Sequence, residues 1–350
     1  MAEAHIIGSI LGAAVGDAIG LPYEGLSRAR ASRLLGPPDS HRFCFGHGMI
    51  SDDTELTCMV AQALIGSGGN VESFRRQFAR RLRLWLLTLP AGIGLATLRA
   101  ILRLWIGFGP EKSGVFSAGN GPAIRSAIIG AAVDDGTLLS ELVRASSRIT
   151  HTDPKAEGGA LAVALAAQMA RQDGTVSGDG FVSRLRSLLG REGDELVSLV
   201  QKAVDAAGRG KSTESFAESL GQAQGVSGYV HHTVPVALHA WLAHQRDYRS
   251  AVSAVIRCGG DADSTAAIVG GIVGASVGKD GIPAEWLGRV KEWPRSAAWM
   301  ESLGAQLDTS LRNLTRMHPM RLPLLAVLFR NLVFLCIVLL HGFRRLLPPY

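Results

Sequence analysis

Apolar residues recur along most of the chain at intervals close to 3.6, which is the spacing that places them on one face of an α-helix. Alternating β-branched positions, which are typical of strands, are hard to find. The pattern therefore predicts an all-α protein. The stretches with the clearest helical spacing are residues 71–89, 95–108, 140–148, 157–171, 194–207, 233–246 and 264–277.

Glycine makes up 42 of the 350 residues, which is a high share for a helical protein. Glycine ends helices in left-handed caps, and its small size lets two helices approach closely. Both uses are typical of many short helices that cross at varied angles. No linker rich in Pro, Ser or Gly divides residues 1–300, and no internal repeat is visible. We therefore expect one compact domain over residues 1–305 and a separate extension over residues 306–350.

The most polar, glycine-punctuated stretches, residues 172–193 and 208–228, are expected to be surface loops around short helices. Near the N-terminus the run IIGSILGAAVG is apolar, but Glu3 and His5 stand where a secretory signal carries basic residues. Asp17 closes the run. We therefore interpret it as a buried helix rather than a targeting peptide.

Composition excludes some broad classes of protein. With 47% hydrophobic and 19% charged residues, the chain is too apolar to be a disordered polar protein. The cysteines are few and form no C-x-x-C pair, so neither a disulfide framework nor a zinc site is indicated. A reducing, cytoplasmic location fits this pattern best. The four cysteines are Cys44, Cys58, Cys258 and Cys336.

The formal net charge of +6 comes from one segment of the chain. Residues 309–350 contain six arginines and no acidic residue, which leaves residues 1–308 neutral overall. A second arginine-rich stretch, between Glu72 and Glu111, has seven arginines and no acid. It could form a nucleic-acid-binding face, but no nucleic-acid fold signature accompanies it. We interpret it as the solvated face of amphipathic helices and expect no nucleic-acid partner.

Residues 322–343 form an apolar stretch long enough to span a bilayer, interrupted mainly by Arg330, Asn331 and His341. An arginine at the centre of a membrane helix costs roughly 2.5–3.5 kcal/mol. Two interpretations stay open: contact with a membrane, either anchored or lying in the interface, and packing against the protein's own body or a partner. The arginines that flank the stretch and would suit lipid head groups are Arg316, Arg321, Arg344 and Arg345.

Four acidic motifs lie far apart in the sequence, each among small residues at the edge of a predicted helix. They are GDAIGLPYEG with Asp17 and Glu24, SDDTELT from Ser51 to Thr57, THTDPKAEGGA with His151, and RCGGDADSTAAIVGG from Arg257 to Gly271. Helix capping would explain a single Ser or Asp in each motif. It does not call for two adjacent carboxylates in one place and a D-x-D in another. Four clustered carboxylates would instead suit two hard divalent ions, Mg²⁺ or Mn²⁺.

These motifs, together with GNGPAIR at residues 119–125, resemble the ADP-ribosylglycohydrolase family in order and in spacing over roughly residues 5–280. The resemblance implies an all-α fold of many short helices around a central cleft with two Mg²⁺ or Mn²⁺ ions. It also implies hydrolysis of the bond from ribose C1″ of ADP-ribose to a modified side chain. The positions that match the family's metal ligands are Ser51, Asp52, Asp53, Asp261, Asp263 and Ser264.

The resemblance further implies which residues meet the substrate. Glu24, Asp53 and Asp261 match acidic residues beside the scissile ribose, although which of them moves the proton is left open. A loop that contacts ADP-ribose corresponds to Gly119, Asn120 and Gly121, and His151 matches a histidine of the same cleft. Taken alone, the GNG turn is an ordinary turn and His151 is equally well explained as a structural histidine.

Several functions remain possible at this point. The expected partner is an ADP-ribosylated protein, and the alternatives are a small ADP-ribose conjugate or a catalytically silent member that only binds ADP-ribose. Outside the family, the chain could be a membrane-tethered helical scaffold whose acidic motifs only cap helices. Retention of all four aspartates argues against a silent member.

Overall fold

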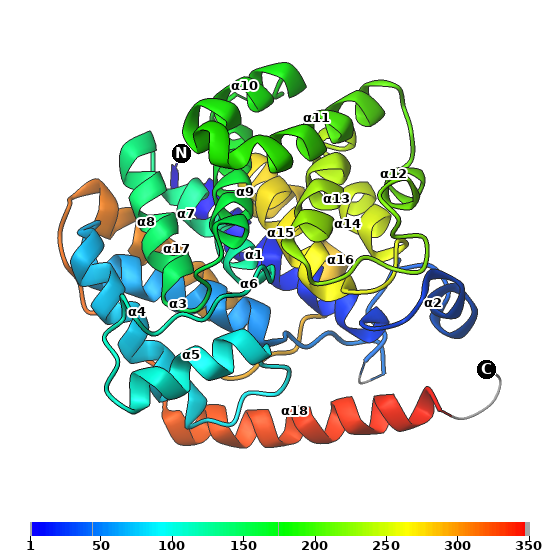
Figure 1. Cartoon of the computed structure of the whole chain (residues 1–350). Helices are drawn as coiled ribbons and strands as arrows, with labels where there is room; N and C mark the ends of the chain where they lie inside the picture. The colour runs from blue at the N-terminus through cyan, green and yellow to red at the C-terminus, as the bar shows by residue number, and fades with distance from the viewer. Residues whose placement is uncertain (1, 44, 174, 347–350) are drawn as a thin grey trace.

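The computed structural model describes residues 2–43, 45–173 and 175–346, and these form an all-α domain with isolated β-bridges (Figure 1). The helices that build the body around the site are α1 (Ala2–Gly20), α2 (Arg28–Leu35), α3 (Asp52–Ser67), α4 (Val71–Leu86), α5 (Leu95–Trp105), α6 (Gly121–Ile124), α7 (Ala127–Ala132), α8 (Gly136–Arg148) and α9 (Pro154–Asp173). They are followed by α10 (Gly178–Leu189), α11 (Asp194–Gly208), α12 (Thr213–Ser219), α13 (Val230–Ala243), α14 (Tyr248–Ile256), α15 (Ala262–Val277), α16 (Ala284–Leu287), α17 (Ala297–Arg312) and α18 (Leu324–Arg344). Short 3-10 turns lie at Leu21–Tyr23, Gly190–Gly193 and Lys279–Gly281.

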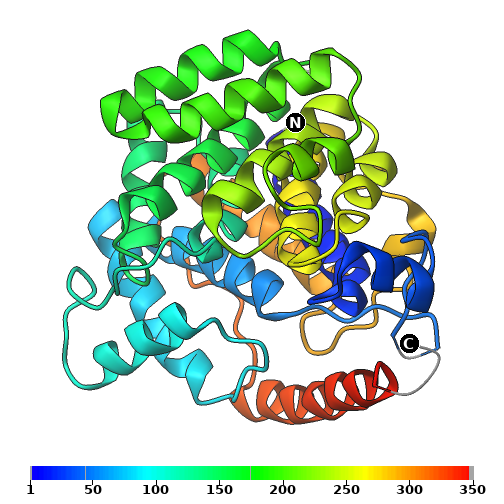
Figure 2. The same ribbon diagram turned by 45° about the vertical axis from the view of Figure 1, so that its right-hand side comes forward.

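Helices α1 and α15 pack along each other at the centre of the molecule, with α3, α7, α9 and α17 around them (Figures 1 and 2). Glycines make the close approach of α1 and α15 possible. A Cβ atom placed at Gly12 would lie 2.2 Å from the carbonyl oxygen of Gly270, and one at Gly8 would lie 2.2 Å from that of Gly274. Because real Cβ atoms do not approach a carbonyl oxygen so closely, only glycine fits at these crossings.

The helical pattern predicted from sequence is confirmed. The apolar stretches correspond to α4, α5, α8, α9, α11, α13 and α15. The N-terminal apolar run is α1, most of whose residues are buried, as expected of a core helix. The two polar stretches hold the short helices α10 and α12 at the surface of the molecule.

Helix α18 lies along one side of the body, below α5 and with its C-terminal end near α2 (Figures 1 and 2). It is one of two helices in the described residues that are long and apolar enough to cross a membrane. Arg330, which interrupts its apolar sequence, does not face solvent. Its Nε and Nη2 atoms donate to the two carboxylate oxygens of Glu292 at 2.6 and 2.7 Å, and Nη2 also donates to the carbonyl oxygen of Ile50 at 2.6 Å. Arg330 therefore ties α18 to the body.

Asn331 adds a second polar contact, because its Nδ2 atom donates to the carbonyl oxygen of Thr88 at 2.8 Å. At the C-terminal end of α18, Arg345 donates to the carbonyl oxygen of Glu24 at 2.7 Å. Helix α17 runs through residue 305, where the sequence suggested the domain ends, and its residues Leu303 and Leu307 are in the core. The segment that connects the two helices lies between Arg312 and Leu324.

Candidate active site

The N-termini of α3 and α15 bring together acidic residues that are about two hundred positions apart in sequence. Ser51 caps α3, where its Oγ atom accepts a hydrogen bond from the Asp53 amide at 3.2 Å. Ser264, in the first turn of α15, donates its hydroxyl to Oδ2 of Asp53 at 2.8 Å. This contact links the two helix ends directly. We call the surrounding group the carboxylate cluster: Asp17, Glu24, Asp52, Asp53, Asp261 and Asp263.

Asp17 of α1 is fully buried and holds the start of α3 in place. Its Oδ2 atom accepts hydrogen bonds from the Ser51 amide at 2.9 Å, the Thr54 amide at 3.3 Å and the Thr54 hydroxyl at 2.5 Å. A carboxylate at this position satisfies amide groups that have no partner within the helix. Asp17 thus positions the segment that carries Asp52 and Asp53.

Glu24 lies beside Asp261 because backbone hydrogen bonds join the segment after Glu24 to Gly260. The Gly25 amide donates to the Gly260 carbonyl at 2.8 Å, and the Gly260 amide donates to the Leu26 carbonyl at 2.8 Å. Gly260 has φ of +80°, and a Cβ atom there would lie 2.1 Å from the Val226 carbonyl oxygen. The position therefore requires glycine. The carboxyl group of Glu24 is at the exposed rim of the carboxylate cluster.

The GNG turn contacts both Asp261 and His151. Asn120 donates from Nδ2 to Oδ2 of Asp261 at 2.6 Å, and its own amide donates to the Gly228 carbonyl at 3.0 Å. The amide of Gly119 donates to the hydroxyl of Ser117 at 3.3 Å. The amides of Gly119 and Asn120 are therefore engaged within the protein, and the turn orients Asp261.

His151 is buried beneath the same turn. A Cβ atom at Gly119 would lie 3.1 Å from its Nε2 atom, so glycine leaves room for the ring. Nδ1 of His151 lies 2.8 Å from the Thr150 hydroxyl, which accepts a hydrogen bond from Arg125 at 2.7 Å. Nε2 of His151 faces the turn. Burial and the nearby Arg125 lower the pKa of His151 to about 3, so the ring is neutral at physiological pH.

Burial and mutual repulsion raise the pKa values of the carboxylate cluster. The pKa of Asp53 lies well above its usual range because the group is buried and near Asp52, Asp17 and Asp261. Asp263 shows the same direction, with burial as the main cause and Glu24 and Asp53 as the next. For Glu24 the causes are partial burial of the carboxyl and the charge of Asp261. A cation would relieve this repulsion.

The oxygen-rich chemistry of the cluster fits hard divalent ions. Carboxylate and hydroxyl oxygens are the ligands that Mg²⁺ and Mn²⁺ prefer, and Oδ1 of Asp263 is buried without a hydrogen-bond partner. Among the described residues, however, no three Asp, Glu, His or Cys side chains are already gathered around one point as ion ligands. The cluster therefore contains suitable ligand oxygens, but these are not arranged as a complete coordination sphere.

Glu55 of α3 is at the centre of a group of buried charged residues that the sequence did not predict. Glu55 is buried and accepts hydrogen bonds from Arg295 at 2.5 Å and from the Trp85 indole. Arg330 of α18 lies 3.8 Å from the same carboxylate. Glu55 was visible in the SDDTELT motif, but no pattern in the sequence could pair it with residues 240 and more positions away.

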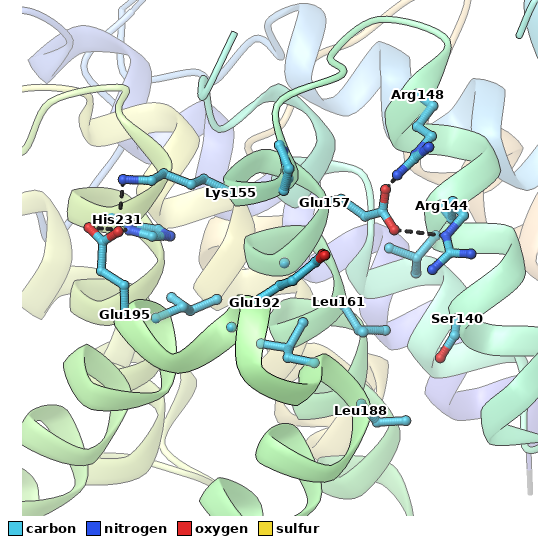
Figure 3. Close-up of a pocket in the computed structure, with 16 residues that line it drawn as sticks. Ser140, Arg144, Arg148, Lys155, Glu157, Leu161, Leu188, Glu192, Glu195 and His231 are labelled. Atoms are coloured by element: carbon cyan, nitrogen blue, oxygen red, sulfur yellow. Dashed lines mark hydrogen bonds and ion pairs between the residues drawn. The ribbon is translucent and has the colours of Figure 1, made fainter. Parts of the chain in front are cut away.

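A separate pocket lies between α8, α9, α11 and α13 (Figure 3), and none of the predicted site residues lines it. Arg144 and Arg148 both point at Glu157, at 2.8 and 2.7 Å. Lys155 lies 2.8 Å from Glu195. Because Glu157, Glu192 and Glu195 balance Arg144, Arg148 and Lys155 in the lining, the pocket has no net positive charge for an anionic ligand.

Comparison with known proteins agrees with the geometry. The sequence profile of the ADP-ribosylglycohydrolase family matches residues 2–316. The chain belongs to this family. It is accordingly an enzyme of the ADP-ribosyl glycohydrolase class, a hydrolase acting on glycosyl bonds. The family match ends before α18, which begins at Leu324.

Several known proteins are similar to the chain over most of its length. An uncharacterised protein of Archaeoglobus fulgidus is 33% identical, covering 81% of this chain and 90% of its own. The ADP-ribosyl-[dinitrogen reductase] glycohydrolase of Rhodospirillum rubrum is 28% identical (81% and 89%), and human ADP-ribosylhydrolase ARH3 is 26% identical (80% and 87%). A solved structure titled ADP-ribosylglycohydrolase-related protein complex shares the fold, with a TM-score of 0.60 and 24% identity over 89% of this chain and 99% of that one.

Proposed function

We propose that the protein is a metal-dependent hydrolase that cleaves the ribose C1″ bond of ADP-ribosylated protein side chains and so reverses this modification. One observation carries the proposal: Asp53 of α3 lies beside Asp261 and Asp263 of α15, and Asp52 lies near Asp17 and Glu24, with Glu24 at the exposed rim. Capping alone would not require so many buried carboxylates in mutual repulsion.

Ser51, Asp52, Asp53, Asp261, Asp263 and Ser264 are the residues that would hold two Mg²⁺ or Mn²⁺ ions. When bound, such ions neutralise the carboxylates, orient hydroxyl groups of a sugar and make water more acidic. The chain itself contributes the positive ends of the dipoles of α3 and α15, whose N-termini lie beneath the acidic side chains.

Hydrolysis adds the oxygen of water to C1″ and returns a proton to the departing side chain, with oxocarbenium character on the ribose in between. Glu24 is suited to move this proton, because it is the rim carboxyl and its pKa is raised by partial burial and by Asp261. Asp261, held by Asn120, and Asp53, held by Ser264, would stabilise the positive charge that develops on the sugar.

Gly119, Asn120, Gly121 and His151 would line the part of the site that takes the rest of ADP-ribose. A neutral His151 can accept a hydrogen bond at Nε2 from a ribose hydroxyl, or donate one to a phosphate oxygen when that nitrogen carries the proton. The name of the R. rubrum relative describes a modified protein as substrate, which supports a protein conjugate here.

The test is release of free ADP-ribose from arginine- and serine-modified proteins and from a small ADP-ribose conjugate. We expect release with Mg²⁺ or Mn²⁺, and none with EDTA. Asp261→Asn should reduce the rate by at least a hundredfold while the helical circular dichroism stays unchanged. Asp280→Asn is the matched control, because Asp280 is an exposed acid at the far end of α15.

Each outcome separates the candidate functions. Release from the small conjugate alone would replace the protein substrate with a small molecule. No release from any conjugate, with tight ADP-ribose binding, would identify a silent member. Equal activity in EDTA after thorough dialysis would remove the metal from the mechanism.

A further inference from the structure

The inner face of α18 is fixed to the body by polar contacts along the helix. Arg330 and Asn331 are buried near its centre, and Val327 and Phe334 are buried on the same side. Beyond them, Nε2 of His341 lies 3.1 Å from the carbonyl oxygen of Pro22. Detaching the helix from the body would leave Glu292 buried without its partner, so α18 remains seated along its length.

The outer face of α18 is apolar from end to end. The exposed large side chains recur every three or four residues, as expected of one face of a helix. No charged side chain is exposed on the helix between Leu324 and Phe343, since Arg330 is turned inward. These exposed side chains are Leu324, Leu325, Phe329, Leu332, Val333, Leu335, Leu339, Leu340 and Phe343.

Arginines gather at both ends of this face. Arg321, just before the helix, lies near Arg81 of α4. Burial, followed by the charges of Arg80 and Arg321, lowers the pKa of Arg81 to about 10. At the other end are Arg344 and Arg345, and Arg30 of α2 donates to the Arg345 carbonyl oxygen at 3.4 Å. Residues 309–350 contain no acidic residue to balance them.

We propose that α18 lies parallel to the surface of an anionic lipid bilayer, with its outer face in the acyl region and its terminal arginines at the head groups. An apolar helix face with cationic ends matches the layered chemistry of such an interface. The inward-facing Arg330 then never enters hydrocarbon. Helix α18 does not cross the bilayer, because its opposite face is occupied by the protein.

The same charges disfavour a second copy of the chain as the occupant. A two-fold dimer through α18 places the helices antiparallel, with Arg321 against Arg344 of the second copy, or parallel, with each arginine against the same arginine of the second copy, or crossed with little contact. Opposed arginines without acidic partners would repel one another. Phosphates of anionic lipids, in contrast, pair with arginine at both ends.

The full-length protein should be tested by flotation with vesicles of phosphatidylcholine alone and of phosphatidylcholine with phosphatidylglycerol. We expect binding to the anionic vesicles that falls steeply with added salt. Phe329→Asp together with Leu340→Asp should weaken it at least tenfold, and Arg321→Gln and Arg344→Gln by roughly fivefold each. Leu314→Asp is the matched control: Leu314 is 76% exposed but outside α18, and Asp tolerates its positive φ.

Cys336 offers a direct measure of how the helix lies, because it is exposed on α18 whereas Cys58 and Cys258 are buried. A polarity-sensitive dye on Cys336, in a Cys44→Ser background, should shift to the blue on anionic vesicles. In the same background with Cys336→Ser, dyes at Leu325→Cys and Leu340→Cys should be quenched to equal extents by lipids brominated at one depth. Unequal depths at these two positions would show a tilted or spanning helix and overturn the parallel arrangement.

Two further results would overturn the proposal. One is absence of wild-type binding to anionic vesicles at low salt while ADP-ribose binding or circular dichroism shows a folded protein. The other is self-association that Phe329→Asp and Leu340→Asp abolish, in a protein that does not bind lipid. Neither result bears on the hydrolase assignment, which is measured with soluble substrates.

Discussion

At the scale of single residues, Asp17 shows how the site depends on a carboxylate that is not in line to contact substrate. It is fully buried, and burial raises its pKa to about 6 despite the hydrogen bonds from Ser51 and Thr54. An acid whose pKa is raised on folding keeps its proton in the folded state over a pH range where the unfolded chain has lost it. Stability is therefore lost as the pH rises through that range.

This has a measurable consequence in metal-free protein. In EDTA, the free energy of unfolding should fall between about pH 4 and pH 6, with a contribution of about 3 kcal/mol from Asp17. Asp17→Asn should flatten this part of the curve, and added Mg²⁺ should do the same for the wild type. Urea unfolding at pH 4.5 and 7 would measure it. Identical pH dependence in the two proteins would show that Asp17 does not titrate as described.

Some of the buried charged residues could be predicted from the sequence, and others could not. The SDDT and GGDAD motifs could be matched to a family because their letters and order are distinctive. The buried contacts of Arg330 with Glu292 and Glu55 could not, because ion pairs between distant segments leave no spacing pattern. In the sequence alone, Arg330 is a charged residue within a stretch long enough to span a membrane, where it would be costly. The structure shows that it pairs with Glu292 instead.

At the scale of helices, the contact between α1 and α15 sets the distance between the two halves of the site. Asp17 stands near the end of α1, and Asp261 and Asp263 stand at the start of α15. The backbones touch at Gly12 and Gly270. Helix positions were predictable from hydrophobic spacing. Which glycines cap a helix, as Gly68 does, and which pack against another helix was not, because both kinds look alike in sequence.

Two substitutions compare a glycine at the contact between two helices with a helical glycine that has room for a Cβ atom. Gly12→Ala should destabilise the protein by about 3 kcal/mol, because its Cβ would collide with the Gly270 carbonyl oxygen and push α1 from α15. Gly158→Ala in α9 should be neutral or stabilise by about 0.5–1 kcal/mol, since its Cβ would lie 3.6 Å from the Leu189 side chain. Thermal unfolding would measure both. Equal stability of the two variants would contradict the close contact.

At the scale of the whole molecule, α18 is joined to the body by electrostatics as much as by apolar packing. Arg330→Met should cost about 3 kcal/mol, because it leaves the buried Glu292 carboxylate without its cation. Adding Glu292→Gln should recover part of that loss, as the neutral amide can still accept a hydrogen bond from the Ile50 amide. Chemical unfolding of the single and double variants gives the coupling. Additive losses would mean that the pair does not interact.

The position of Arg330 in the chain also gives the protein an order of assembly. The ribosome makes Glu55 and Glu292 before it makes Arg330, and domains commonly begin to fold during synthesis. The body therefore begins to fold while Glu292 still lacks its cation, whereas Glu55 already has Arg295. Until α18 docks, Arg330 is outside the interior and Glu292 is unpaired, so the docking of α18 completes the folded core.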